Sequence, residues 1–266
     1  GIFNTVSGSG KNAYLWKGVL RLDPSSGIVD LDNASDFYNS VEKSVSGVYV
    51  NSGVTVNGAS DNQIAFADIN PYATIYVKMT NDGTVNLSGK NTIGIYTDNG
   101  EITNNGALNV TGQGGLALFG ENDTKIKNNG AVTIGNAGIG IYGISYQNPS
   151  AAQSYGAGKI DIENAGTITA NTGSNAVGIY ADNNKISSPA SNAQIKLSTG
   201  TIDVKNSENG IGVYVNKGTV TGLGATISVG KNGIALYAKD SVVSLSGTTI
   251  NLSGDNALGL FLYGNT

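Results

Sequence analysis

The residues of this sequence that could do chemistry are a few carboxylates that recur at similar positions. Asp98 and Glu121 each stand two residues after an aromatic side chain, and Asp182 occupies an equivalent place further along the chain. Hydrolysis of a glycosidic bond requires two carboxyl groups about 5 to 9 Å apart. The other equivalent positions hold Ile144, Asn216 and Lys239. Since the acids form no continuous series, we expect no enzymatic activity, with a polysaccharide-active glycosidase or lyase as the alternative.

The sequence lacks the residue types that most other catalytic mechanisms and metal sites require. The 266-residue chain has no Cys and no His, which excludes the usual zinc ligands, a Ser-His-Asp triad, a thiol nucleophile and disulfide bonds. The Gly-Gly-x-Gly-x-Asp repeat of calcium-binding β-rolls is also absent. We therefore expect no metal and no cofactor. The net charge of -4 gives no basic patch for a nucleic acid.

Binding residues are expected where aromatic and polar side chains stand outside any regular pattern. The first 45 residues hold the only Trp and the only Arg, and two later stretches rich in Ser, Ala and Asn interrupt the order of the chain. The predicted binding residues are Tyr14, Trp16, Arg21, Phe37, Tyr38, Tyr146, Gln147, Asn148 and Tyr155, with Lys185 and Asn192 as comparable candidates. The alternative for the N-terminal segment is that it only covers the end of the fold.

The composition predicts the elements that must position these residues. With 39 Gly, 39% hydrophobic and only 13% charged residues, the chain is too apolar for disorder and too rich in Gly for helices. An ordered all-β protein with many turns is expected. One pattern recurs, a small or polar residue followed by aliphatic, Gly or Ala, aliphatic and aromatic residues. Its aromatic residues are Tyr96, Phe119, Tyr142, Tyr180, Tyr214, Tyr237 and Phe261.

The spacing of these aromatics predicts a repeating coil. They lie 23, 23, 38, 34, 23 and 24 residues apart, so two copies carry insertions, near 143–157 and 183–193. Each period holds three short alternating runs separated by turn residues, which is typical of a parallel β-helix with three strands per coil. We expect a division into an irregular N-terminal segment, 1–45, and a β-helix, 46–266. About nine coils at about 4.8 Å each would make a rod on the order of 40 Å long.

Alternation along the strand predicts which side chains point inward. Two aliphatic columns are expected to form the core, because period two places them on one face. The first column precedes the aromatic residue and comprises Val48, Phe66, Ile95, Leu118, Ile141, Ile179, Val213, Leu236 and Leu260. The second comprises Ile64, Ile93, Leu116, Ile139, Val177, Ile211, Ile234 and Leu258. The aromatic column and the Gly or Ala column would then face outward.

Two further features admit alternatives. The outward aromatic column could stabilise the sheet, or it could be a contact surface for a sugar or a protein, unless a bend in the strand turns the rings inward. The corners Asn104-Asn105-Gly106 and Asn128-Asn129-Gly130 are predicted to be turns, where Asn and Gly tolerate positive φ. Stacked Asn residues could also form hydrogen-bonded ladders inside the coil.

Taken together, the Ile-Gly-Ile-Tyr copies, the Asn-Asn-Gly closures and strands such as 84–89 resemble the passenger region of type Va autotransporter adhesins. The likeness covers roughly residues 45–266 and is greatest to the large, Gly/Asn-rich outer-membrane adhesins of fusobacteria. It implies a right-handed β-helix on the outer surface of a Gram-negative cell, attached through a barrel absent from this fragment, or secreted.

The resemblance further implies adhesion to a surface protein or glycan of another bacterium or of host cells. The expected function is that of a non-enzymatic adhesin fragment, a monomeric rigid stalk whose loops make the contacts. The repeat motifs themselves are scaffold, so the resemblance identifies no binding residue.

Overall fold

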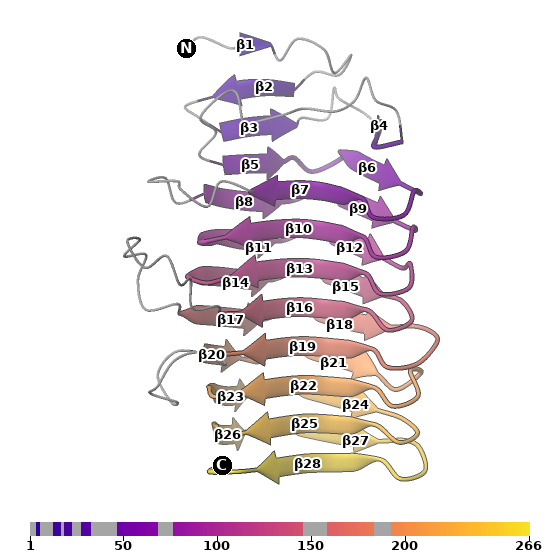
Figure 1. The fold of residues 1–266 in the computed structure, drawn as a ribbon, viewed down its shortest axis with the longest axis vertical. Coiled ribbons are helices and arrows are strands. Elements are labelled where there is room, and N and C mark those ends of the chain that lie inside the picture. Colours follow the sequence, from indigo (N-terminus) through magenta and orange to yellow (C-terminus); the bar gives the residue numbers. More distant parts are fainter. Residues whose placement is uncertain are drawn as a thin grey trace.

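The computed structural model describes residues 4–5, 13–16, 19–22, 28–32, 47–68, 77–145, 159–183 and 193–266. These residues form 28 β-strands and no helix, and hence no helix that could cross a membrane. The strands build a right-handed parallel β-helix, with β1 and β28 at opposite ends of an elongated rod (Figure 1). The predicted all-β fold, with three strands per coil, is confirmed.

Three sheets run along the rod, and from β5 to β28 each coil contributes one strand to each sheet. Sheet A contains β1 (Asn4–Thr5), β2 (Ala13–Trp16), β3 (Val19–Leu22), β5 (Gly47–Val50), β8 (Val77–Asn81), β11 (Gly100–Asn104), β14 (Thr124–Asn128), β17 (Ile160–Asn164), β20 (Ala193–Lys196), β23 (Thr219–Leu223) and β26 (Val242–Ser246). Sheet B contains β4 (Ile28–Asp30), β6 (Thr55–Gly58), β9 (Thr84–Leu87), β12 (Ala107–Val110), β15 (Ala131–Ile134), β18 (Thr167–Ala170), β21 (Thr201–Val204), β24 (Thr226–Val229) and β27 (Thr249–Leu252). Sheet C contains β7 (Ile64–Asp68), β10 (Ile93–Asp98), β13 (Leu116–Glu121), β16 (Ile139–Ile144), β19 (Val177–Asp182), β22 (Ile211–Asn216), β25 (Ile234–Lys239) and β28 (Leu258–Tyr263).

The insertions read from the aromatic spacing fall at one corner of the coil. Strand β16 ends at Ile144 and β17 begins at Ile160, while β19 ends at Asp182 and β20 begins at Ala193. Both connections therefore join sheet C to sheet A. A third long connection, residues 69–76, joins β7 to β8 at the same corner and was not predicted from the aromatic spacing. In the remaining coils this corner is short; Asn99 alone separates β10 from β11 and has a φ of 62°.

The N-terminal strands extend sheet A with a change of direction. Strand β2 pairs antiparallel with β1 and with β3, and β3 then pairs parallel with β5. Strand β5 belongs to sheet A, where Val48 pairs with Met79. The placement of Val48 in the same column as Ile95 was therefore wrong, whereas Phe66 does pair with Ile95.

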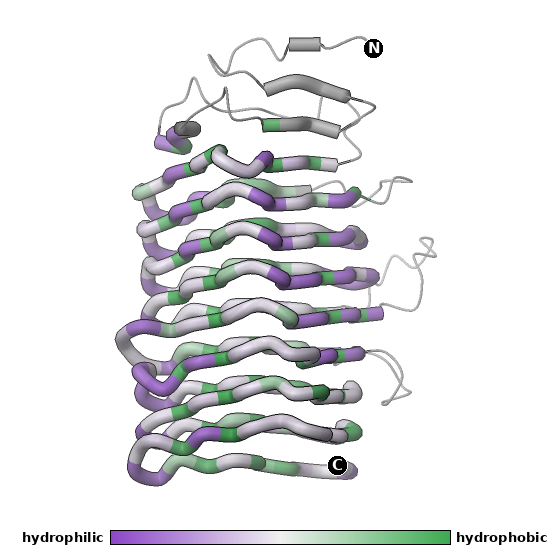
Figure 2. Tube along the Cα trace, turned by 180° about the vertical axis from the view of Figure 1, so that it is seen from behind, coloured by the Kyte–Doolittle hydropathy of each residue, from purple (hydrophilic) through white to green (hydrophobic). Residues whose placement is uncertain are grey.

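The interior of the coil is mainly aliphatic. Ile95 from sheet C, Ile102 from sheet A and Leu108 from sheet B are each at most 1% exposed, and their equivalents in the next coils are as deeply buried. The alternation of hydrophobic and hydrophilic residues that produces this interior is visible along the strands (Figure 2). In the last coil Leu260 is 44% exposed, because no further coil covers it.

The second predicted core column lies outside the core. Ile93 is only partly buried and Ile64 is 41% exposed, whereas Gly94 and Ile95 are both buried. Two successive inward positions break the alternation, and Gly94 has no partner in the register between β10 and β13. A Cβ on Gly94 would lie 3.1 Å from Leu108 Cδ2 of the facing sheet. The Gly and Ala column therefore faces inward, and the strand bends where a small residue lets the two sheets approach.

The Asn-Asn-Gly corners do not have the positive φ angles that the sequence predicted. Asn104 and Gly106 have no positive φ; such angles occur at other corners, as at Asn91 with 53°. A Cβ on Gly106 would lie 2.0 Å from the carbonyl oxygen of Gly83, so this Gly permits the close approach of two coils.

The predicted ladder of hydrogen-bonded Asn side chains inside the coil is confirmed. It comprises Asn81, Asn104, Asn128 and Asn164, linked by side-chain bonds of 2.8 to 2.9 Å.

Candidate functional site

An aromatic ladder runs along the outer face of sheet C. It is formed by Tyr96, Phe119, Tyr142, Tyr180, Tyr214, Tyr237 and Phe261, whose ring centroids lie 4.5 to 5.2 Å from their neighbours. Tyr180 and Tyr214 are stacked, with 18° between their planes. Burial, and then the neighbouring Tyr180, raise the pKa of Tyr214 to about 12. The other five pairs are tilted, with 31° to 60° between their planes, so each ring contacts its neighbours along the ladder without forming a continuous face-to-face stack.

The acidic pair that motivated the enzyme alternative lies beside this ladder. Asp98 and Glu121 end strands β10 and β13 and occupy paired positions in the parallel register. Each carboxylate already has a protein donor: Tyr96 Oη donates to Glu121 Oε2 at 2.8 Å, and Asn122 Nδ2 donates to Asp98 Oδ1 at 2.7 Å. Desolvation by burial raises the pKa of Glu121, and the charge of Asp98 adds to this rise, while the bond from Tyr96 opposes it.

The other acids near this corner are held by the backbone or by an amide. Asp123 Oδ1 accepts the backbone N–H of Lys159 at 2.7 Å, and Asp182 Oδ1 accepts Asn216 Nδ2 at 2.9 Å. These bonds tie one coil to the next. Among the described residues, no three acidic side chains gather into a group that could hold a metal ion.

A groove on the outer face of sheet B is a site that the sequence interpretation missed. This amide groove has a volume of about 510 Å³ and is lined chiefly by Asp30, Asp32, Asn57, Asn86, Asn109 and Thr111. The three Asn residues stand in register on β6, β9 and β12. Asn86 Nδ2 donates to Asn57 Oδ1, and Asn109 Nδ2 donates to Asn86 Oδ1, both at 2.9 Å. The signal was present as an Asn in the third position of three successive sheet B strands, but it was interpreted as scaffold.

Asp32 closes the N-terminal end of the amide groove. Its carboxylate accepts the backbone N–H of Ala59 at 2.8 Å, both the hydroxyl and the N–H of Ser60, and Gln63 Nε2 at 2.7 Å. The bond from the Ser60 hydroxyl contributes most to a lowered pKa of Asp32, followed by the bond from Ala59. Asp32 therefore carries its charge at neutral pH, and Asp30 lies next to Asn57 in the register.

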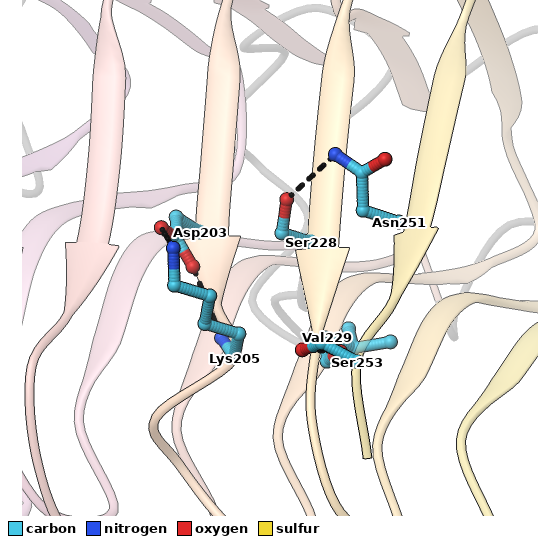
Figure 3. A network of polar contacts seen from close by, with 6 residues as sticks. All are labelled: Asp203, Lys205, Ser228, Val229, Asn251 and Ser253. Carbon is cyan, nitrogen blue, oxygen red and sulfur yellow. Dashed lines mark hydrogen bonds and ion pairs between the residues drawn. The ribbon is translucent and has the colours of Figure 1, made fainter.

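The same column of sheet B looks different toward the C-terminus (Figure 3). There Asp203 forms an ion pair of 3.1 Å with Lys205, and Asn251 Nδ2 donates to Ser228 Oγ at 3.2 Å. Ser253 Oγ donates to the carbonyl of Val229. The consecutive amides of the groove thus belong to the first coils only.

The structure places few of the predicted binding residues. Tyr14 and Trp16 belong to β2 and Arg21 belongs to β3; Tyr14 and Arg21 are register partners, and nothing is described of these three side chains. The remaining predicted residues lie outside the described residues: Phe37, Tyr38, Tyr146, Gln147, Asn148, Tyr155, Lys185 and Asn192.

Comparison of the chain with known proteins finds no similar protein. No protein-family model, no curated protein and no solved structure matches the chain. The class that the fold defines is the right-handed parallel β-helix, which occurs in both adhesins and enzymes.

Proposed function

We propose that this chain is a fragment of a cell-surface adhesin of the autotransporter kind, a rigid β-helical stalk that presents binding surfaces for attachment to other bacteria or to host cells. The observation that carries the proposal is the unbroken interior. Side chains such as Val56, Ile141 and Val229 are at most 1% exposed along most of the rod. Hydrogen-bonded sheets around such an interior resist bending, and resistance to bending is what projection from a surface requires.

Two features support a binding role rather than catalysis. The two insertions connect a strand of sheet C to a strand of sheet A, a place where sequence can vary without changing the strands that form the core. The acids Asp98 and Glu121 each accept a hydrogen bond from a neighbouring side chain, so they serve to join coils. The sequence resemblance to autotransporter passengers agrees with this assignment.

An attachment assay tests the proposal. The 266-residue chain is coupled to fluorescent microspheres, and their binding to a panel of bacteria and epithelial cells is counted at increasing coating density. We expect saturable attachment by the folded chain and none by microspheres coated with the denatured chain. Absence of attachment to every cell type would refute the adhesin function.

A polysaccharide-active enzyme is the second candidate, favoured by one observation. Glu121 is half-buried, has a raised pKa and stands beside Asp98, as a general acid next to a second carboxylate would. Incubation of the chain with a panel of polysaccharides, followed by a reducing-end assay, distinguishes the two. Release of reducing ends that is abolished in Glu121→Gln would establish the enzyme.

A further inference from the structure

We infer that the amide groove of sheet B binds an uncharged or amino-bearing oligosaccharide whose chain runs parallel to the rod. The inference rests on the proposed adhesive function, for which it supplies a binding site and a ligand class. The site lies on the regular strands β6, β9 and β12 of sheet B, whereas the insertions connect strands of sheets C and A.

The first step is the hydrogen-bonding capacity of the ladder. A side-chain amide has two N–H donors and a carbonyl oxygen with two lone pairs. Asn86 uses one N–H toward Asn57 and accepts one bond from Asn109. One donor and one acceptor site of Asn86 therefore remain for a molecule in the groove. A sugar hydroxyl both donates and accepts, so it can bond to both at once.

The second step is the repeat distance. Asn57, Asn86 and Asn109 stand on consecutive coils, which follow one another at about 4.8 Å. This distance is similar to the length of one sugar ring in an extended oligosaccharide. With Asp30 as the next member of the column, the four positions span about 14 Å, enough for three to four sugar units.

The third step is charge. Among the described residues, the lining contains two carboxylates, Asp30 and Asp32, and no Lys or Arg. Sialylated and sulfated sugars would be repelled there, whereas hydroxyl groups can donate to a carboxylate and an amino sugar would add an ion pair. The carboxylates therefore select against anionic glycans.

The fourth step is that the groove is specific to this part of the column. Further along, Asp203 is neutralised by Lys205, and Asn251 bonds to a hydroxyl instead of an amide. Asn251 provides a matched control, because it stands in the same column of sheet B but outside the amide groove.

The experiment starts from a glycan array probed with the full 266-residue chain. The array carries uncharged hexose and N-acetylhexosamine oligomers, glucosamine oligomers, and sialylated and sulfated oligosaccharides. We expect binding to uncharged or amino-bearing tetramers, weaker binding to the dimers and none to the anionic set. Exclusive binding of anionic glycans, or binding of none, would overturn the inference.

Calorimetry with the best array ligand then locates the site. In the double variant Asn86→Ala/Asn109→Ala we expect affinity about tenfold lower, as for the loss of one or two hydrogen bonds. Asn251→Ala should retain affinity within about twofold. As a readout independent of any variant, the side-chain NH₂ resonances of Asn57, Asn86 and Asn109 should shift when the ligand is added. Unchanged affinity in the double variant, or shifts confined to other residues, would place the ligand elsewhere.

The two proposals fail separately. Microspheres that attach to cells while the chain binds no oligosaccharide would overturn the groove inference and leave the adhesin function standing. Oligosaccharide binding without attachment to any cell would overturn the adhesin function and leave the groove inference standing.

Discussion

The hydroxyl of Tyr96 on strand β10 donates a 2.8 Å hydrogen bond to Glu121 Oε2 on strand β13, one coil further along the rod. This bond joins the aromatic ladder to the column of acids and polar residues beside it. It also gives the half-buried carboxylate a donor that water would otherwise supply. The bond thus couples the ionisation of Glu121 to the packing of the ladder.

Removing this hydroxyl should change the ionisation of Glu121. The bond from Tyr96 lowers a pKa that burial has raised, so Tyr96→Phe should raise the pKa of Glu121 further. Titration of the side-chain carboxyl carbon by NMR measures the change. Tyr237→Phe, at the other end of the ladder, serves as the control and should leave the titration unchanged. A lower pKa in Tyr96→Phe would show that the hydroxyl does not stabilise the carboxylate.

The pH dependence of stability should carry the signature of Glu121. Its folded pKa lies above the ordinary value of 4.5, so the folded chain holds this proton more tightly than the unfolded chain. The stability due to Glu121 is therefore present below pH 4.5 and is lost as the pH rises through the folded pKa. Denaturant unfolding of Glu121→Gln and the parent chain, from pH 4 to pH 8, measures the difference. The unfolding free energy of the variant, relative to that of the parent chain, should rise with pH by less than about 1 kcal/mol, because the site is partly exposed. A relative unfolding free energy that falls as the pH rises would contradict a raised pKa of Glu121.

The buried Asn ladder inside the coil should contribute more to stability than the exposed hydrogen bond between Asn129 and Asn105 on the surface. Asn104 is fully buried and both donates to Asn128 and accepts from Asn81. Asn104→Ala leaves a buried carbonyl without its donor and should cost about 2 to 3 kcal/mol of unfolding free energy. Asn129→Ala removes an exposed bond to Asn105 and should cost less than about 1 kcal/mol. Equal losses in urea unfolding would mean that burial does not govern these ladders.

Gly106 should not tolerate a methyl group. A Cβ there would lie 2.0 Å from the carbonyl oxygen of Gly83, a backbone atom that cannot rotate away. Gly106→Ala should cost more than about 2 kcal/mol. At Gly259, by contrast, the nearest atom would be Ile250 Cγ2 at 3.9 Å, so Gly259→Ala should be close to neutral. Thermal unfolding of both variants makes the comparison, and a neutral Gly106→Ala would show that the coils can separate.

The aromatic ladder should act in stability and not in attachment. The stack of Tyr180 on Tyr214 is lost in Tyr180→Ala, at a cost of about 2 kcal/mol. Tyr180→Phe keeps the stack and should cost less than about 1 kcal/mol. Attachment of coated microspheres, measured well below both melting temperatures, should be equal for the two variants. A loss of attachment in Tyr180→Ala alone would instead make the ladder a contact surface.

The repeat could be predicted from the sequence because its signals are local. The aromatic spacing located the coils, and the residue before each aromatic in sheet C, such as Ile95, was correctly placed in the core, except for Leu260 in the last coil. The prediction of which side chains point inward failed where the strand departs from strict alternation of inward and outward residues. Ile93 was assigned inward because period two was continued across Gly94, where the strand bends. Val48 was misaligned because one aliphatic-aromatic pair is too short a pattern to identify a sheet.

The sequence by itself determined the all-β class, the period of the coil, the positions of the insertions after β16 and β19, and the absence of Cys and His chemistry. The tertiary structure alone decided which face each column occupies and that Asn57, Asn86 and Asn109 form one ladder in a groove with Asp30 and Asp32. The reason is physical. A period records how residues repeat along the chain, whereas a groove and its charge depend on how successive coils align across space.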